Sequence, residues 1–379
     1  MQLTEYNAGN HEPQLEYKSF LPKPIHHDWV ISDPQIQHLL GQADRALGEL
    51  NAFAQLIPDI DFFVKMYVVK EANQSSRIEG TQTTIEDAFK DVADIQPDAR
   101  DDWYEVRNYI AAINFAIARL EQLPLSNRLL RETHGVLMRG VRGKTKLPGE
   151  FRRSQNWIGV SLKNAVFVPP HHGHVETLMS DLEKFLHDKN ALVPPLIKIA
   201  IAHYQFETIH PFLDGNGRLG RLMISLYLAS EELLVKPALY ISDYFERNKT
   251  AYVDHLMAVR QGNHMREWLV FFLHGVAETA NGSTAVFRSI LAIKERMERE
   301  ILPRFSHRRQ ANAQALVKHL YANPVVQVHG VEKLLNTTTN TATTLVSDLA
   351  KYGMLQEITG QKRNRLFVFR EYMDLFRAG

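Results

Sequence analysis

The residues HPFLDGNGRLGR, positions 210 to 221, bring an imidazole, a carboxylate, an amide, two guanidinium groups and three glycines into twelve positions. Gly215 and Gly217 flank Asn216, and glycine adopts positive φ without a steric penalty. The backbone N–H groups of such a loop can therefore turn inward around an anion. A helix that begins at this loop would add the positive end of its dipole. The spacing predicts a phosphate-binding site.

The charged side chains of this segment extend the prediction to chemistry. Arg218 and Arg221 lie three apart on the first turn of the expected helix, so both can reach an anion and indicate more than one phosphate. The hard carboxylate of Asp214 suits a magnesium ion that also touches phosphate. His210 can take a proton from an attacking hydroxyl near neutral pH. Together these groups predict phosphoryl or nucleotidyl transfer.

The alternative interpretation is a glycine-rich turn with charged residues on its surface. The neighbouring segments argue against this alternative, because LIKIAIAHYQFETIH precedes the motif and LMISLYLASEELL follows it. Both are strongly apolar and predict buried helices, the first opened by Pro194 and Pro195. Polar groups enclosed between two such helices would be costly to bury without a ligand. We therefore favour a ligand site.

Other elements must hold this loop in place. Apolar spacing predicts further helices over residues 34–57, after Pro58, and over 101–123, 245–260 and 265–300. Residues 1–30 contain three prolines and little periodicity, which predicts an extended arm lying on the body. In GEFRRSQNWIGVSLKNAVFVPP, apolar residues flank the polar stretch SLKN, which predicts a β-hairpin.

The last 75 residues form a separate unit in this interpretation. Residues 305–379 hold ten Lys or Arg against five Asp or Glu, a net charge of +5, which leaves −4 for the remainder. The pattern predicts helices over 311–322, 328–336 and 338–352, followed by strands MLQEI and RLFVF. This is the order of a winged-helix module. NTTTNTATTLVSDLAKYG would be its recognition helix and QKRNR its basic wing.

The bulk composition restricts the function classes. The 379 residues are 45% hydrophobic and 23% charged, with a formal net charge of +1, which gives no global attraction to nucleic acid or membrane. The chain has no cysteine, so disulfides, thiolate nucleophiles and cysteine-ligated zinc are excluded. No secretory leader and no long apolar run are apparent, so we expect a cytoplasmic protein without a membrane partner.

The motif resembles the signature of the Fic family, H-P-F-x-[D/E]-G-N-G-R-x-x-R, at every defined position. PGEFRRSQNWIG followed by VFVPP is similar to the segment that leads into the flap hairpin of that family, and LYISDYFERNKTAYVDHL is similar to a later helix. The resemblance covers roughly residues 30 to 280. It implies a mainly α fold, with a Fic-type helical core, a β-hairpin flap and a C-terminal winged-helix domain as a common companion.

The domain division that follows has four parts. We expect an N-terminal arm and helices over 1–100, a catalytic core over 101–280, a linker helix over 281–304 and the winged-helix domain over 305–379.

The resemblance also implies an activity, the transfer of AMP from ATP to a Ser, Thr or Tyr hydroxyl of a target protein, with release of pyrophosphate. His210 would be the base and Asp214 the magnesium ligand. Asn248 and Tyr252 would line the base and ribose side of the nucleotide. The triphosphate would be held by Gly215, Asn216, Gly217, Arg218 and Arg221. The target segment would align on a flap formed by Ile158, Gly159, Val160, Phe167 and Val168, by strand addition.

The short segment SSRIEG, residues 75 to 80, resembles the inhibitory helix of the same family, [S/T]-x-x-x-E-[G/N]. Ser75 and Glu79 share a helix face, and Gly80 offers a helix stop. The resemblance implies that Glu79 pairs with Arg221 and keeps that arginine from the γ-phosphate, so that ATP binds poorly. In some relatives the same glutamate assists hydrolysis of the AMP ester, so a reverse activity stays open.

Two other segments invite functions that their residues do not support. GVRGKT, residues 140–145, lacks the first glycine of a P-loop, since Met138 stands there, and Pro148 disfavours a following helix. His171, His172 and His174 could bind a metal, but no carboxylates accompany them at a matching spacing, which favours a solvated loop.

Other functions remain open at this stage. One is a nucleotide-sensing regulator that binds DNA through the winged helix, although sensing would not need His210. Another is an enzyme of the same fold that uses a different phosphate donor. The sequence leaves undecided the target, which could be the chain itself, whether the winged helix contacts DNA or protein, and whether the chain forms a homodimer.

Overall fold

A computed structural model describes residues 1–56, 60–140, 145–236, 238–361 and 365–377. Two helices form its centre, α6 (Pro195–Ile209) and α7 (Asn216–Ser230), and almost every residue of both is buried. Their sequences are apolar on all faces, as a helix surrounded by other helices requires. They lie at the two sides of the 210–215 loop, so the expected buried helices around the motif are confirmed.

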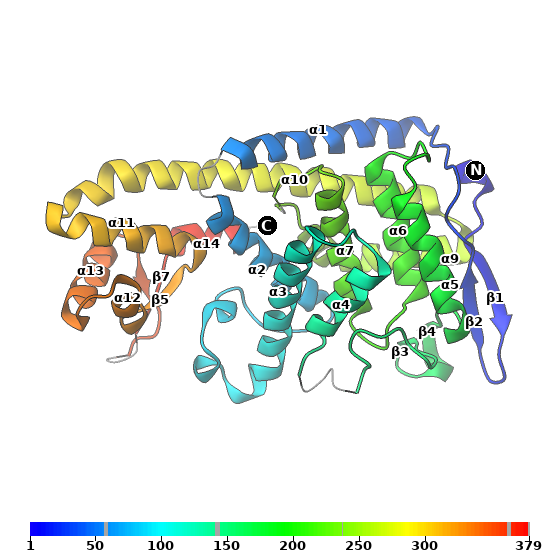
Figure 1. Ribbon diagram of the computed structural model, residues 1–379, viewed down its shortest axis with the longest axis horizontal. Helices are drawn as coiled ribbons and strands as arrows, with labels where there is room; N and C mark the ends of the chain where they lie inside the picture. The colour runs from blue at the N-terminus through cyan, green and yellow to red at the C-terminus, as the bar shows by residue number, and fades with distance from the viewer. Residues whose placement is uncertain (57–59, 141–144, 237, 362–364, 378–379) are drawn as a thin grey trace.

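Further helices surround this pair (Figure 1). They are α3 (Arg100–Leu120), α4 (Asn127–Leu137), α5 (Val175–His187), α8 (Ser242–Arg247) and α9 (Lys249–Gly262). The expected single helix over 245–260 is interrupted, because Asn248 has the non-helical dihedrals φ −113° and ψ 33° and separates α8 from α9. Short 3₁₀ turns occur at Leu3–Glu5, Asp87–Phe89, Val92–Asp94, Pro97–Ala99, Leu162–Asn164, His172–His174 and Leu302–Arg304.

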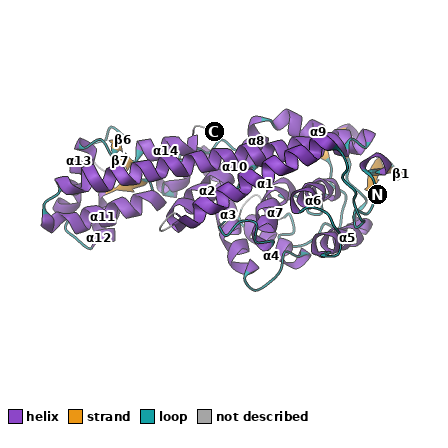
Figure 2. Ribbon diagram, turned by 90° about the horizontal axis from the view of Figure 1, so that it is seen from above, coloured by secondary structure: helices purple, strands orange, loops and turns teal. Residues whose placement is uncertain are grey.

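Two long helices run side by side along the molecule, α1 (Pro34–Leu56) and α10 (Met265–Arg296) (Figures 1 and 2). α10 continues as a π-helical turn over Met297–Ile301 and ends in the turn that contains Pro303. It therefore crosses the expected boundary between core and linker at residue 281 without a break. One helix joins the core to the C-terminal unit.

Helix α2 (Ile60–Ile78) extends from the C-terminal unit to the 210–215 loop. Gly80 has φ +108°, a value that side-chain-bearing residues rarely adopt, and the helix ends just before it. The helix stop expected at Gly80 is thus confirmed.

The structure has two hairpins in the first half of the chain. The expected hairpin forms from β3 (Ile158–Gly159) and β4 (Ala165–Phe167). The second, β1 (Gly9–Pro13) with β2 (Lys18–Pro22), lies within the segment expected to be an extended arm. Its residues are mostly polar and show no alternation of polar and apolar side chains, so the sequence did not indicate strands there. The Phe20 N–H donates to the Val168 carbonyl at 2.9 Å, so this hairpin supports the base of the β3–β4 hairpin.

The C-terminal unit contains the helices and strands expected there. They are α11 (His307–Ala322), α12 (Val328–Leu335), α13 (Thr339–Lys351), β6 (Gln356–Glu357) and β7 (Leu366–Val368). The structure adds β5 (Val325–Gln327) and α14 (Arg370–Arg377), and the antiparallel sheet has the order β5-β7-β6. Positions 362–364 of the expected wing and 141–144 of the rejected P-loop segment lie outside the described residues.

In the described part of the chain, no helix combines the length and the apolar character needed to span a membrane.

Candidate active site

The 210–215 loop has a defined backbone geometry. His210 ends α6 in the left-handed conformation, with φ 51°, and Gly215 precedes α7 with φ 77°. Asn216 braces the turn between them, because its Oδ1 accepts from the Phe212 N–H at 2.8 Å and its Nδ2 donates to the Phe212 carbonyl at 2.9 Å. The loop is therefore preformed, with the N-terminus of α7 at its edge.

Two buried residues of the segment before the flap hold His210 by its backbone. Arg152 Nε donates to the His210 carbonyl at 2.9 Å, and Asn156 Nδ2 donates to the same oxygen at 3.0 Å. Asn156 Nδ2 also donates to the Phe212 carbonyl at 2.8 Å. A non-glycine residue in the left-handed region persists only where its surroundings over-determine it. These donors supply that restraint.

The imidazole of His210 is prepared to act as a base. Burial above all, together with the charges of Arg260 and Arg152, lowers its pKa to about 4, so the ring is neutral at pH 7. Its Nδ1 lies 3.4 Å from the Glu207 carbonyl, an obligate acceptor, so the ring proton belongs on Nδ1. Nε2 is then the nitrogen able to accept a proton.

His210 opens onto a cavity of about 360 Å³. Its walls come from the motif loop, α2, α6, α7, α9 and the β3–β4 hairpin. Expected site residues that line it are Glu79, Ile158, Phe167, His210, Asp214, Gly215, Asn216, Gly217, Arg218, Arg221 and Tyr252. One cavity therefore collects most of the predicted site.

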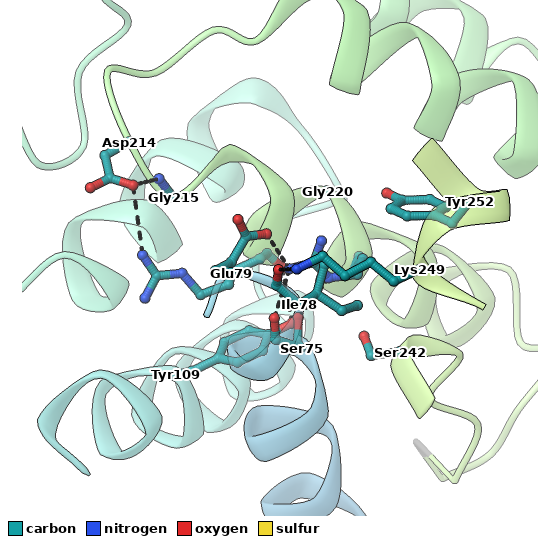
Figure 3. Close-up of polar contacts among 12 residues, drawn as sticks. Ser75, Ile78, Glu79, Tyr109, Asp214, Gly215, Gly220, Ser242, Lys249 and Tyr252 are labelled. Carbon is teal, nitrogen blue, oxygen red and sulfur yellow. Dashed lines mark hydrogen bonds and ion pairs between the residues drawn. The ribbon is translucent and has the colours of Figure 1, made fainter. Parts of the chain in front are cut away.

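The end of helix α2 brings Ser75 and Glu79 close to one another (Figure 3), and both residues bind Arg221. Arg221 Nη2 donates to Glu79 Oε1 at 2.6 Å and to the Ser75 carbonyl at 2.9 Å, while its Nε donates to Ser75 Oγ at 2.8 Å. Arg221 is 2% exposed and Glu79 is 40% exposed. Burial alone would raise the pKa of Glu79, but Arg221 holds it below its usual value. The pairing implied by the family resemblance is present.

Gly217 leaves space for this ion pair. It does not share the positive φ of Gly215, so the expectation that both glycines serve backbone turning is wrong for Gly217. A Cβ at position 217 would lie 2.3 Å from Glu79 Oε1 and 2.9 Å from Arg221 Nη1. The absence of a side chain is what allows the carboxylate to approach the helix.

Arg218 and Arg221, which the sequence suggested would both face one anion, bind different partners here. Its Nη1 donates to Glu105 Oε2 of α3 at 3.1 Å, and its Nη2 lies 3.8 Å from Asp214 Oδ1. The hydroxyl of Tyr109 donates to the Arg218 carbonyl at 2.9 Å. The two arginines are thus held by carboxylates from different helices, and both still line the cavity.

Asp214 is compatible with a magnesium ion. Its side chain is 44% exposed, and its Oδ1 accepts from the Gly215 N–H at 2.6 Å. Magnesium is commonly held by one or two carboxylates together with phosphate oxygens and water. The described residues contain no group of three or more His, Asp or Glu suited to a metal, so a metal here would depend on nucleotide oxygens for its remaining ligands.

The β3–β4 hairpin presents apolar side chains to solvent. Val160 is 92% exposed and Ile158 36%, whereas Phe167 is buried beneath the guanidinium of Arg260, 4.0 Å from its ring. A register shift at Ile158 and Gly159 bends the short hairpin. Bulges of this kind accompany edges that terminate regular pairing.

The residues expected at the nucleoside end separate in the structure. Tyr252 is buried and lines the cavity, while the Asn248 amide donates to the Tyr244 carbonyl at 2.9 Å as part of the α8–α9 junction. Lys249, its neighbour, lines the cavity and donates from Nζ to the Ile78 carbonyl, near Glu79.

His134 of α4, a residue with no predicted role, positions the motif. Its Nδ1 accepts from the Gly149 N–H at 2.9 Å, so its Nε2 donates to the Asp214 carbonyl at 3.0 Å. The ring stacks on Phe212 with centroids 3.8 Å apart. Burial lowers the pKa of His134 to about 4, which keeps this tautomer neutral.

The other residues without an assigned role are Arg152, Asn156, Glu207 and Arg260. Glu207 gave a usable signal, because it is the only carboxylate in the mostly apolar segment LIKIAIAHYQFETIH. The three histidines of the rejected metal cluster lie beside the flap, where His174 Nε2 is 3.3 Å from Glu12 Oε2 of β1.

Comparison with family models identifies the class of protein. Residues 37–118 match the Fic/DOC family N-terminal region, and residues 124–228 match the Fic/DOC family itself. These residues contain α2, the flap and the whole 210–221 motif. The chain is a Fic/DOC family protein.

Particular relatives match over shorter stretches. Protein adenylyltransferase Fic of Aedes aegypti is 36% identical over 116 residues, which is 30% of this chain and 21% of the relative. Protein adenylyltransferase Fic of Drosophila yakuba is 40% identical over 81 residues, 21% of this chain and 15% of the relative. The chain spans about a fifth of the length of these relatives.

Solved structures extend the similarity of fold. A Fic family protein from Desulfovibrio desulfuricans G20 superposes with a TM-score of 0.57 at 20% identity, covering 90% of this chain and 97% of that one. A Fic domain containing signaling protein from Bacteroides thetaiotaomicron gives a TM-score of 0.51 at 16% identity, covering 67% and 95%. The mainly helical Fic fold is thereby shown.

Proposed function

We propose that the chain is a protein adenylyltransferase that transfers AMP from ATP to a hydroxyl side chain of a target protein. The observation that carries the proposal is a neutral His210 in the same cavity as Arg218, Arg221 and the N-terminus of α7. A base beside an anion site is what nucleotidyl transfer needs. The partial similarity to protein adenylyltransferases supports the choice of reaction.

In this mechanism His210 Nε2 accepts the proton of the target hydroxyl as its oxygen attacks the α-phosphorus of ATP. The bond from that phosphorus to the oxygen bridging to the β-phosphate breaks, and pyrophosphate leaves. Arg218, Arg221 and the amides at the start of α7 balance the phosphate charge. Magnesium held by Asp214 would supply further positive charge to the phosphates.

The flap would hold the target segment. Its apolar residues Ile158 and Val160 are exposed, and a short hairpin edge can pair with an extended peptide through backbone hydrogen bonds. Strand addition selects backbone geometry more than sequence. A target is therefore any protein that can pair with the flap and place a hydroxyl near His210. A second copy of the chain could also meet this requirement.

We also propose that α2 restrains this activity. The Glu79 carboxylate occupies Arg221, and a γ-phosphate bound to Arg221 would meet that carboxylate. Like charges in contact repel, so ATP binding in the reactive orientation requires Glu79 to leave. The exposure of Glu79 on the cavity side is compatible with its displacement.

The experiment that tests both proposals is incorporation of α-labelled ATP into protein in a cell lysate with magnesium. Wild type, Glu79→Gly and the double variant Glu79→Gly with His210→Ala are compared. We expect strong labelling in the single variant and none in the double variant. ATP binding without labelling in any of them would contradict AMP transfer and favour another donor or a nucleotide-sensing role.

For the C-terminal unit we propose a winged-helix module. The order α11, β5, α12, α13, β6, β7 supports this assignment, as does the net charge of +5 over 305–379. A salt-dependent shift of labelled duplex DNA by the full chain would support nucleic-acid contact. Its absence would favour a protein partner for α13.

A further inference from the structure

A buried carboxylate in the cavity has no place in the mechanism above. Glu207 lies on the last turn of α6, three residues before His210, and is 6% exposed. Its Oε1 has no hydrogen-bond partner in the described structure. The same oxygen packs against α7, where a Cβ on Gly220 would come within 2.2 Å of it. An unpartnered buried carboxylate is costly, which calls for a function.

Glu207 lines the cavity together with Glu79, Arg221, Tyr252 and Arg260. Arg221 and Glu79 act on its charge from the phosphate end, and Arg260 acts on it from the end nearer the flap. The charge of Glu207 in turn helps to raise the pKa of Tyr252 in α9. The carboxylate therefore stands between the phosphate-binding end and the α9 wall.

Several donors near Glu207 already have other acceptors. Arg221 donates to Ser75 and Glu79, and Arg260 Nε donates to Thr208 Oγ1 at 3.1 Å. His203 Nδ1 lies 3.0 Å from the Gly220 carbonyl and must donate to it.

The hydroxyl of Tyr252 is already hydrogen-bonded to the same histidine. Because Nδ1 of His203 carries the ring proton, its Nε2 accepts from the Tyr252 hydroxyl at 2.9 Å. None of these contacts serves Glu207, and a molecule bound in the cavity that Glu207 lines can supply a donor to its carboxylate.

The position of Glu207 selects the part of the nucleotide that it meets. Arg221 and the start of α7 mark the phosphate end, while Val253, Leu256 and Met257 form an apolar wall suited to a base. The ribose lies between phosphate and base in any nucleotide. Its 2′ and 3′ hydroxyls are donors, and an acidic residue that accepts from ribose hydroxyls is a recurring solution in nucleotide sites.

We propose that Glu207 accepts hydrogen bonds from the ribose hydroxyls and makes the site selective for ribonucleotides. This inference rests on the proposed use of ATP. It assigns Glu207 to substrate selection, separate from His210, which acts on the target hydroxyl.

The test is nucleotide binding, measured by calorimetry with magnesium on the full chain carrying Glu79→Gly and His210→Ala. ATP, 2′-deoxy-ATP, 3′-deoxy-ATP and 2′,3′-dideoxy-ATP are compared on each protein. At about pH 8.5, above the pKa of about 7 to which burial raises Glu207, the carboxylate is charged. A hydrogen bond to a charged group is typically strong enough that we expect the dideoxy nucleotide to bind about tenfold or more weakly than ATP at this pH. The two monodeoxy nucleotides show which hydroxyl contributes.

Adding Glu207→Ala should bring ATP and the dideoxy nucleotide to within about twofold of one another, because only the acceptor for the hydroxyls is lost. Glu207→Gln keeps one acceptor and should retain part of the difference. Val235→Ala, a change at an exposed residue outside the cavity, is the control and should keep the full difference. Each comparison is a ratio on one protein, so a general weakening of binding cancels.

The outcomes separate this inference from the proposed function. Equal binding of ATP and the dideoxy nucleotide with Glu207 intact would overturn the inference, even if Glu207→Ala failed to fold. Discrimination that survived Glu207→Ala would overturn it as well. Failure of ATP to bind at all would instead overturn the proposed function and the inference with it.

Discussion

At the scale of single residues, His210 is restrained in two separate ways. Arg152 and Asn156 fix its backbone, and burial with nearby arginines sets the charge of its ring. The backbone restraint determines where Nε2 points, whereas the charge restraint determines whether Nε2 can accept a proton. The two can be tested independently.

The charge restraint predicts an unusual pH profile for AMP transfer. An ordinary histidine with a pKa near 6.5 would lose roughly three quarters of its basic form at pH 6. Because the pKa of His210 is lowered to about 4, the base stays unprotonated, and the transfer rate of Glu79→Gly at saturating ATP should change little between pH 7 and pH 6. Single-turnover labelling measures this rate.

Glu207 titrates in the same range, since burial raises its pKa to about 7, so the profile is repeated with Glu207→Gln. A fall of threefold or more by pH 6 in both proteins would contradict the neutral, low-pKa base.

The backbone restraint predicts the effect of Asn156→Ala. The change removes the donors to the His210 and Phe212 carbonyls while Arg152 remains, so the loop should fold but hold His210 less precisely. Misplaced reacting groups cost about tenfold to a hundredfold in rate. We expect kcat to fall by that amount with little change in the KM for ATP, in steady-state labelling on the Glu79→Gly background. Ser154→Ala, with an exposed side chain in the same segment, should leave both constants unchanged.

At the scale of elements, α2 couples two side chains to one arginine. Ser75 and Glu79 lie one helical turn apart and together take three hydrogen bonds from Arg221. Ser75 Oγ holds Nε, and Glu79 holds Nη2. Removing one of these side chains should therefore release Arg221 only in part.

Ser75→Ala should raise labelling above wild type, but less than Glu79→Gly does, because one charged hydrogen bond is lost while the carboxylate stays. The neighbouring Ser76 offers a matched control, since it is fully buried on the same helix and its hydroxyl has no hydrogen-bond partner in the described structure. Labelling by α-labelled ATP compares the variants. An equal rise in Ser76→Ala would show that loosening of α2, and not release of Arg221, explains the effect.

At the scale of the whole molecule, the N-terminal half of α2 packs on the C-terminal unit. Phe63 lies 5.1 Å from the ring of Tyr321, and Tyr67 lies 5.3 Å from Phe376 and 5.2 Å from Phe287 of α10. The same helix that carries Glu79 is therefore anchored at its other end by α11, α14 and α10 (Figure 2). The C-terminal unit should help to hold α2 in the inhibitory position.

Phe376→Ala tests this long-range support. Loss of a buried phenylalanine costs about 3 to 5 kcal/mol of stability and leaves Tyr67 without one of its ring contacts. We expect faster hydrogen exchange in residues 74–80 and more labelling than in wild type. Leu178→Ala in α5 removes a buried side chain elsewhere in the core and is the control. If both variants gained labelling equally, general destabilisation would account for the result.

The sequence determined most of the elements and the composition of the site. Apolar periodicity located α1, α3, α6 and α7, and alternation around SLKN located the β3–β4 hairpin. The motif located the loop between α6 and α7. Such signals are local, because helix periodicity and turn chemistry act over a few residues. The β1–β2 hairpin was not predicted because its polar strands are stabilised by contacts with the body. The break at Asn248 was not predicted because the residues on either side favour helix.

Only the tertiary structure decided how the side chains of the site are shared. Arg218 and Arg221 are three residues apart, yet Glu105 of α3 holds Arg218, while Arg221 pairs with Glu79 at the end of α2 as the family resemblance implied. The burial of Glu207 and the backbone contacts of Arg152 likewise join segments distant in the chain or depend on the packing of α6 against α7. Spacing along a chain fixes which side chains share a helix face, but a partner more than a hundred residues away is chosen by packing. The chemistry and, through the family resemblance, the pairing of Glu79 with Arg221 were therefore readable in the sequence, while the packing that holds His210, Arg218 and Glu207 in place emerged from the fold.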